Sequence, residues 1–292
     1  PFPGWTLPGV MTLGAAQILA KEHGVAPGKK VLIAGSGPLL LATASKLTQT
    51  PGVEVVGILE ATRPQQWLSH AMAVRGNADR LQEGWHYLRT IVKHKIPYRF
   101  GHTVIQVKGR EGVKKAIVAR LNRAGNPLPG SKEPWDVDTV CLGFGFVPNT
   151  ALAQLAGCRL THRPELGGWA TWASETMQTN VAGIYAAGET TGVHGAKAAL
   201  LEGEITGLAV AQTLGYLNKP TFEQNMISLR RRLKPLRRFG AMLNTLFTAP
   251  TGLNMITTND TILCRCEDVT AGDVRSAIKA GATNLSALKN WT

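Results

Sequence analysis

Two glycines separated by one residue, Gly35 and Gly37, follow a short β-branched run and precede a stretch with helical character. In a dinucleotide-binding turn, the first glycine permits the tight turn and the second lets the backbone approach a pyrophosphate at the helix N-terminus. Leu40 stands in place of the third glycine, so the motif gains its specificity only from its context. The candidate pyrophosphate-binding residues are Gly35, Ser36, Gly37, Pro38 and Leu39.

Glu60 ends the next apolar run, where dinucleotide-binding units carry an acidic residue. A carboxylate at this place accepts hydrogen bonds from ribose hydroxyls and repels a 2′-phosphate, which favours NAD over NADP. Arg63 follows closely and weakens that preference. We therefore expect NAD(H) or another adenine nucleotide, and the alternative is a nucleotide fold that binds nothing.

A strand, a turn and a helix must position these residues, and the sequence predicts each of them. Residues 29–33 are expected to form a strand, residues 39–47 a helix and residues 53–59 a second strand. Together they make a βαβ unit of the dinucleotide-binding type.

The rest of the chain continues this α/β pattern. We expect a helical stretch at about 65–95, strands at 103–107, 113–122 and 138–142, a Gly- and Pro-rich turn at 125–132, a strand and turn at 183–189, a small-residue helix at 195–214 and a helical connector at 216–260.

Composition limits the possible functions. The 292 residues are 44% hydrophobic, which suffices for a buried core in roughly two domains. The formal charge of +13 suggests nucleic-acid binding, but the densest basic cluster, residues 230–238, lies outside any nucleic-acid-binding motif. We expect a solvated helix face or a contact with an acidic partner subunit there, and no nucleic-acid partner.

The lack of a recognisable targeting signal and the small number of cysteines favour a cytoplasmic protein. No apolar run approaches the roughly 18 residues of a membrane-spanning helix, and no signal-peptide pattern opens the chain. Four unevenly spaced cysteines do not make a disulfide scaffold. Cys141 is expected in the core, and the sequence around Cys158 indicates no function for it.

The histidines are scattered along the sequence, so the catalytic residues are unknown. His194, near a glycine turn, is the histidine to test.

Two further glycine turns, Gly143–Asn149 and Ala187-Gly188-Glu189, follow the nucleotide-binding unit along the chain, each after an expected strand. That order resembles the two-dinucleotide flavoproteins related to disulfide reductases, in which an NAD domain is inserted within an FAD domain. The resemblance implies FAD contacts at Gly143, Gly188, Glu189 and Gly195. Glu189 stands where the family usually has an aspartate that holds the flavin ribitol, and the helix after Gly195 would direct its amides at the flavin.

Three segments, Pro1–Thr12, Gly35–Ala42 and Gly143–Asn149, are similar to the large subunits of opine oxidases, dye-linked proline dehydrogenases and hydrogen cyanide synthase. The resemblance implies an FAD-linked subunit that relays electrons in the oxidation of CH–NH bonds of an opine, proline or related secondary amine. It also implies a hetero-oligomer with a small FAD-dependent subunit like D-amino-acid oxidase. The alternative is a nucleotide-bound scaffold subunit without turnover of its own.

Cys264 and Cys266 open a terminal segment that resembles a small ferredoxin-like module with a [2Fe–2S] cluster. Such a cluster needs four thiolate ligands. The resemblance supplies two of them here and places the other two beyond Thr292, so we expect the cluster in a longer parent protein. It likewise places the first FAD-binding turn upstream of Pro1. The alternative for the pair is two reduced cysteines in an exposed turn.

The expected fold is therefore an α/β two-dinucleotide-binding flavoprotein followed by a small, truncated helical module. The expected segments are 1–27 (end of the first FAD segment and linker), 28–138 (nucleotide-binding domain), 139–215 (second FAD segment), 216–260 (helical connector) and 261–292 (start of the cluster-binding module).

Overall fold

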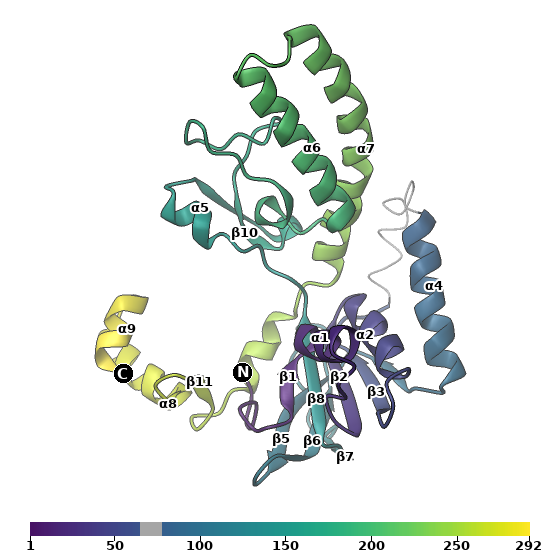
Figure 1. Cartoon of the computed structure of the whole chain (residues 1–292). Helices are drawn as coiled ribbons and strands as arrows, with labels where there is room; N and C mark the ends of the chain where they lie inside the picture. The colour runs from purple at the N-terminus through teal and green to yellow at the C-terminus, as the bar shows by residue number, and fades with distance from the viewer. Residues whose placement is uncertain (65–77) are drawn as a thin grey trace. The chain divides into compact units, whose positions relative to one another are not determined.

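The computed structural model describes residues 1–64 and 78–292, which divide into two compact units (Figure 1). Unit 1 contains Pro1–Arg63, Gly84–Phe144 and Ala249–Thr292. Unit 2 contains Gly145–Thr248 together with the segment Pro64–Glu83. In the part of the chain described, no helix is long and apolar enough to cross a membrane.

Unit 1 is built on a five-stranded parallel sheet in the order β1-β8-β2-β3-β4. Its strands are β1 (Val10–Thr12), β2 (Lys30–Ser36), β3 (Glu54–Glu60), β4 (Tyr98–Phe100) and β8 (Thr139–Phe144). The expected strands at 29–33, 53–59 and 138–142 are confirmed, each with ends shifted by a few residues.

Both faces of this sheet are covered, as its continuous apolar strands require. Successive side chains of β2 point to opposite faces, so Val31 and Ile33 enter one core and Leu32 and Ala34 the other. The first core packs against α1 (Leu13–Glu22), α2 (Leu39–Leu47) and the end of α4 (Ala78–Lys93).

The second core packs against a three-stranded antiparallel sheet. It is formed by β5 (His102–Gly109), β6 (Val113–Arg120) and β7 (Glu133–Asp136). The expected helix at 39–47 and the strands at 103–107 and 113–122 are confirmed. Of the helical stretch expected at about 65–95, α4 is the part inside the described residues, and residues 65–77 lie outside them.

β8 lies between β1 and β2, with Val140 beside Val10 and Gly143 beside Gly35. The strand therefore belongs to the nucleotide-binding sheet, and the boundary between the two units falls after Phe144. The expected boundary at residue 138 cuts through this sheet. The assignment of residues after 144 to an FAD domain stays a prediction.

Unit 2 joins a small hairpin to a pair of packed helices. The hairpin is β9 (Leu160–Arg163) with β10 (Gly168–Thr171), preceded by α5 (Ala151–Leu155). The short helices η2 (Pro164–Leu166) and η3 (Gly188–Thr191) lead to α6 (Ala196–Thr213) and α7 (Lys219–Leu246). α6 and α7 bury Ile205, Met226 and Leu233 in a shared core.

One expected element of unit 2 is wrong. In place of the strand expected at 183–187, the described residues of this segment make one isolated bridge, between Gln178 and Tyr185. A segment forms a strand only where a neighbouring strand completes its backbone hydrogen bonds, and the single bridge at Tyr185 does not extend into a ladder.

The last part of unit 1 consists of η4 (Thr251–Ile256), β11 (Ile262–Cys264), β12 (Val269–Thr270), α8 (Ala271–Lys279) and α9 (Leu285–Trp291). α8 begins with a capping box, in which Thr270 and Asp273 each accept a hydrogen bond from the other's backbone amide. The indole Nε1 of Trp5 donates to the carbonyl of Ile262 at 2.6 Å, and Arg265 lies over the same indole ring. These contacts attach the terminal segment to the start of the chain.

Candidate nucleotide- and flavin-binding sites

The candidate pyrophosphate turn lies at the carboxyl end of the parallel sheet, between β2 and α2. Gly35 sits so close to β8 that an added Cβ would lie 1.7 Å from the carbonyl oxygen of Gly143. Gly37 has φ +106°, a conformation that favours glycine. Ser36 is buried at the end of β2, Pro38 precedes α2, and Leu39 is its first residue.

Glu60 lies at the end of β3, beside this turn, and is fully buried. One carboxylate oxygen accepts from the Gly37 amide at 3.0 Å. The other accepts from the Thr62 amide at 2.9 Å and the Thr62 hydroxyl at 2.8 Å. Burial raises the pKa of Glu60, and these hydrogen bonds oppose the shift. Glu60 therefore fixes the glycine turn, and its contact with ribose hydroxyls stays a prediction.

The start of α2 lies at this turn and carries the partial positive charge that favours an anion. The first residues of a helix have amides without intrahelical acceptors, and the partial positive charge of the helix end lies there. The amide of Gly37, just before α2, donates to Glu60, and the amides of Leu40 and Leu41 donate to the carbonyls of Gly37 and Pro38.

Gly143, an expected flavin-binding residue, lies beside Gly35 in unit 1. An added Cβ at Gly143 would lie 2.9 Å from the Leu13 side chain. The residue therefore allows β8 to pack closely against α1. Its contact with FAD stays a prediction.

The second candidate turn lies in unit 2, where Gly188 and Glu189 form the start of η3. Gly188 has φ +80°. The side chain of Glu189 is exposed and makes no hydrogen bond or ion pair with the described residues. Gly195, with φ +85°, precedes α6, whose first turn has no side-chain cap and no acidic residue. An exposed carboxylate and an uncapped helix end are therefore available for a ligand with hydroxyl and acceptor groups.

A buried carboxylate in α6 holds this turn in place. Glu202, 1% exposed, accepts from the Gly188 amide at 2.8 Å and from the Thr191 hydroxyl at 2.9 Å with one oxygen. Its other oxygen accepts a hydrogen bond from Nε of Arg237 at 2.9 Å and forms an ion pair with Nη2 at 2.8 Å, while Nη2 donates to the sulfur of Met177. Sequence patterns did not single out this residue. Its spacing could have indicated it, because Glu202 lies at helical intervals from Ala198, Ile205 and Ala209 on the buried face of α6.

His194 is 8% exposed, and its Nδ1 has no hydrogen-bond partner among the described residues. Burial lowers the pKa of His194; the nearby Glu202 raises it, and Arg237 lowers it further. The backbone at two glycines lies close to the ring, since an added Cβ at Gly240 would lie 2.9 Å from the Cδ2 of His194 and one at Gly192 would lie 2.8 Å from its Cε1.

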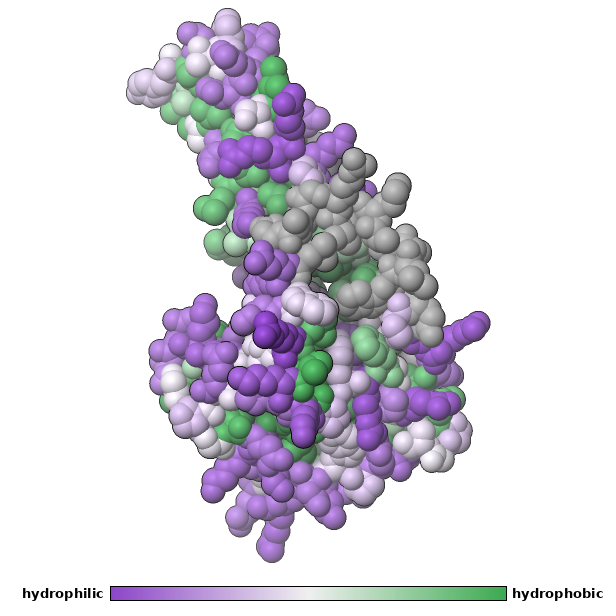
Figure 2. Space-filling view, turned by 90° about the vertical axis from the view of Figure 1, so that its right-hand side faces the viewer, coloured by the Kyte–Doolittle hydropathy of each residue, from purple (hydrophilic) through white to green (hydrophobic). Residues whose placement is uncertain are grey.

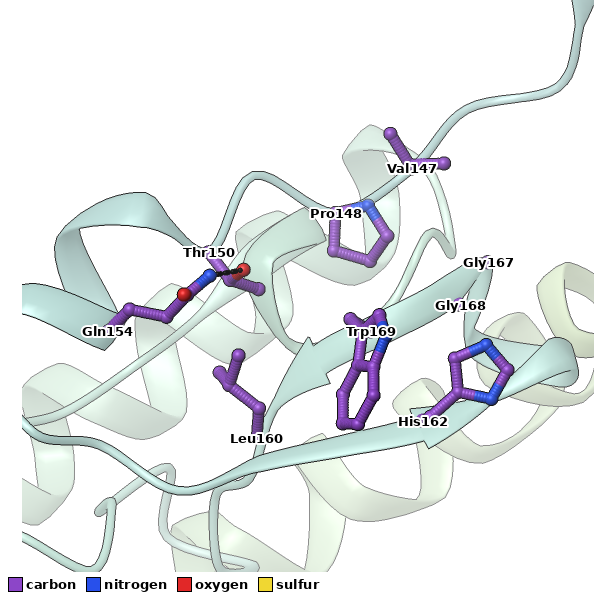
Figure 3. A pocket seen from close by; sticks show the side chains of 9 residues that line it. All are labelled: Val147, Pro148, Thr150, Gln154, Leu160, His162, Gly167, Gly168 and Trp169. Atoms are coloured by element: carbon purple, nitrogen blue, oxygen red, sulfur yellow. Dashed lines mark hydrogen bonds between the residues drawn. The ribbon is translucent and has the colours of Figure 1, made fainter. Parts of the chain in front are cut away.

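Unit 2 also contains a pocket of about 650 Å³. Figure 3 shows Trp169 and His162 on its two hairpin strands, with their rings packed edge to face at 5.2 Å. Gln154 donates to the hydroxyl of Thr150 at its rim. The sequence did not predict this pocket. Its walls are formed by Val147, Pro148, Thr150, Gln154, Leu160, His162, Gly167, Gly168 and Trp169.

The terminal cysteines do not fit an iron–sulfur cluster on their own. Cys264 is half-buried, Cys266 is exposed and both are free thiols. Among the described residues, no group of three or more His, Cys, Asp or Glu side chains could hold a metal ion. Two thiolates are half of the ligand set that a [2Fe–2S] cluster needs.

The other two cysteines are buried. Burial raises the pKa of the Cys141 thiol to about 12, as expected for a core cysteine. The thiol of Cys158 lies 3.6 Å from the hydroxyl of Thr179.

Much of the basic cluster on α7 is paired within unit 2. Arg230 contacts Glu175 at 2.8 Å, and Arg232 contacts Glu204 at 4.0 Å. Arg237 makes the buried contact with Glu202. On the face shown in Figure 2, hydrophilic residues cover most of the surface around smaller apolar groups. The cluster therefore includes internal ion pairs on a solvated helix.

Residues 3–213 match the family model for pyridine nucleotide-disulphide oxidoreductases. This match includes the glycine turn, Glu60 and the Gly188-Glu189 turn. The chain belongs to this family. The predicted fold class, a Rossmann-type α/β fold of FAD- and NAD(P)-binding oxidoreductases, is confirmed.

Individual relatives agree with the narrower resemblance. The chain is 31% identical over 300 residues to hydrogen cyanide synthase subunit HcnB of Pseudomonas aeruginosa, covering 100% of this chain and 62% of that protein. It is 30% identical over 293 residues to an opine oxidase subunit of Agrobacterium tumefaciens, covering 100% of this chain and 56% of that protein. The chain thus spans little more than half the length of these relatives.

A solved structure shares the fold. L-proline dehydrogenase from P. horikoshii superposes with a TM-score of 0.61 at 19% sequence identity, covering 100% of this chain and 45% of that one. The predicted similarity to opine oxidases, hydrogen cyanide synthase and proline dehydrogenases is thereby confirmed, and the iron–sulfur module stays a prediction.

Proposed function

We propose that this chain is part of an FAD-linked oxidoreductase subunit that relays electrons in the oxidation of CH–NH bonds of an opine, proline or related secondary amine. One observation carries the proposal. An exposed carboxylate at Glu189, with no ion-pair partner among the residues that the structure describes, lies in the turn just before the uncapped N-terminus of α6, in a chain whose relatives include opine oxidase subunits.

The residues around this turn have the donors and acceptors that a flavin requires. Glu189 would accept hydrogen bonds from ribitol hydroxyls, and the first amides of α6, after Gly195, would donate to the flavin ring. Gly188 lets the backbone turn sharply at this point. When bound, the flavin accepts and passes on electrons, whereas the protein binds and orients it.

The glycine turn of unit 1 is proposed to bind NAD(H) or another adenine nucleotide. Residues Gly35–Leu39 would surround the pyrophosphate at the start of α2. Glu60 would support this turn through the Gly37 amide. A ribose contact would use Oε2, which accepts a single hydrogen bond from the described residues, because Oε1 already accepts two.

The partner is proposed to be a small FAD-dependent subunit resembling D-amino-acid oxidase, in a hetero-oligomer that holds the amine substrate. The names of the relatives support this proposal, because each is one of several chains of its enzyme. Cys264 and Cys266 are proposed as two of four [2Fe–2S] ligands in a longer parent protein.

The buried state of Glu60 favours a second candidate function, a scaffold that uses its nucleotide structurally. Both Glu60 oxygens already accept hydrogen bonds from the protein. A nucleotide beside such a turn could stabilise unit 1 by mass action without any turnover.

An anaerobic absorbance spectrum of the full-length protein with its co-purifying partners tests both functions. We expect flavin bands that bleach when an opine, proline or NADH is added. Bleaching would identify the electron donor. A protein that retains an adenine nucleotide but shows no bleaching with any of these donors contradicts the electron-relay function and supports the scaffold.

A further inference from the structure

The carboxylate of Glu202 joins three parts of unit 2. One of its oxygens accepts the Gly188 amide and the Thr191 hydroxyl, which lie at the two ends of η3. The other oxygen accepts a hydrogen bond from Nε of Arg237 on α7 and lies 2.8 Å from its Nη2 in the same ion pair. The side chain is therefore buried with both of its oxygens accepting hydrogen bonds and with a guanidinium as its ion-pair partner.

α7 contacts the adjoining segment with the same face that carries Arg237. Nδ2 of Asn244 donates to the carbonyls of Glu165 at 3.0 Å and Val193 at 2.9 Å. Gly240 lies against the backbone of His194. Arg237, Gly240 and Asn244 are spaced by three and four residues, which places them along one side of the helix. The segment 188–194 is thus held at its start by Glu202 and near its end by Asn244.

We propose that Glu202, oriented by Arg237, is a positioning residue that fixes the Gly188–Thr191 turn and with it the direction of the Glu189 carboxylate. This inference rests on the proposed function, because it takes Glu189 as a flavin contact. Glu202 itself is buried below the turn and acts through Gly188 and Thr191. Charge-assisted hydrogen bonds in a buried position are strong enough to select one turn conformation.

Replacement by glutamine separates this role from simple space filling. A glutamine amide has one acceptor oxygen and one donor nitrogen. In either orientation its nitrogen would face donors, either Arg237 or the pair formed by Gly188 and Thr191. Glu202→Gln therefore keeps the volume and loses half of the acceptors.

The chain offers a matched control. Glu204 lies on the same helix and faces Arg232 of α7, but this pair is exposed and separated by 4.0 Å. Glu204→Gln thus removes the same charge between the same two helices without touching the turn. Thr191→Val removes the hydroxyl, which contacts both Glu202 at 2.9 Å and the Gly188 carbonyl at 2.8 Å, and serves as a second variant if Glu202→Gln does not fold.

The experiment measures two quantities in the full-length protein. Hydrogen exchange of the Gly188 amide reports on the turn in the absence of flavin, and titration of the apoprotein with FAD reports on binding. For Glu202→Gln we expect both the exchange rate and the dissociation constant for FAD to rise by about tenfold or more, as for loss of a charge-assisted hydrogen bond. Thr191→Val should raise both in the same direction by less, and Glu204→Gln should leave both within about twofold.

The outcomes separate the inference from the proposed function. Unchanged exchange at Gly188 in Glu202→Gln, or faster exchange with unchanged FAD affinity, overturns the positioning role. Equal effects of Glu202→Gln and Glu204→Gln also overturn it, because they would show a general charge effect. If the wild-type protein binds no FAD, the proposed flavin site fails; faster exchange in Glu202→Gln alone then still assigns Glu202 to the turn.

Discussion

The buried carboxylates of Glu60 and Glu202 are stabilised by different kinds of donor. Glu60 accepts hydrogen bonds from two backbone amides and one hydroxyl, whereas Glu202 accepts them from one backbone amide, one hydroxyl and the guanidinium of Arg237. Burial favours the neutral form of a carboxyl group and therefore raises its pKa, as it does at Glu60. In both cases the carboxylate accepts the amide of a glycine in a turn, Gly37 or Gly188. Buried acids thus shape both candidate binding turns.

His194 should make unit 2 sensitive to acid. Because burial lowers its pKa in the folded state, the unfolded chain binds a proton first as the pH falls below about 6.5. The free energy of unfolding should therefore decrease from pH 7 toward pH 5, and His194→Gln should flatten this decrease. Urea unfolding at a series of pH values measures the effect. The exposed His23→Gln is the control, and equal slopes for both variants would exclude His194 as the source.

At the scale of single residues, the binding turns can be located from sequence, but the groups that support them cannot. The glycines were predictable because their spacing reflects local backbone needs. Glu202 was not, since its donors at Gly188 and Arg237 come from separate parts of the chain. The burial of Glu60 could not be foreseen either, because it depends on how the strands and helices around it pack.

Among the elements, the strand–helix pair at the nucleotide turn follows most directly from sequence. α2 begins at Leu39 and ends at Leu47 as predicted, because it has an apolar face and follows a glycine turn. The strand predicted at 183–187 did not form. Local propensity cannot say whether a neighbouring strand will be present.

Contact between β2 and β8 depends on the absence of a side chain at Gly35. In Gly35→Ala the new methyl group would meet the carbonyl of Gly143 at 1.7 Å, so the strands must separate. We expect a loss of about 3–5 kcal/mol in the free energy of unfolding or an insoluble protein. Gly84→Ala in α4 is the control, because no atom of the described residues lies within 4 Å of its added Cβ. Its stability should rise by up to about 1 kcal/mol, and urea titration of both variants decides between these expectations.

At the scale of the whole molecule, sequence patterns could not predict the strand order of the sheet. The βαβ unit predicted β2 beside β3, but the position of β8 between β1 and β2 depends on pairing between residues far apart in the chain. The predicted boundary at 138 falls ahead of β8 for the same reason.

The terminal segment of unit 1 should depend on one indole. Trp5→Phe removes the donor to the Ile262 carbonyl and leaves that group without its partner. We expect faster hydrogen exchange across residues 262–279 by about fivefold to tenfold, corresponding to about 1 kcal/mol. Trp291→Phe, at an exposed position in the same segment, should change nothing. Equal exchange in the two variants would show that Trp5 does not hold the segment.

The position of β8 also dictates when unit 1 can complete its folding. During synthesis β1, β2 and β3 are made well before Thr139, so one edge of β2 stays unpaired until β8 has been synthesised. An open apolar strand edge is a template for pairing between chains. A chain that ends between β7 and β8 would therefore expose that edge and aggregate. A chain that ends a few residues after Phe144 would contain β8 and could complete the sheet.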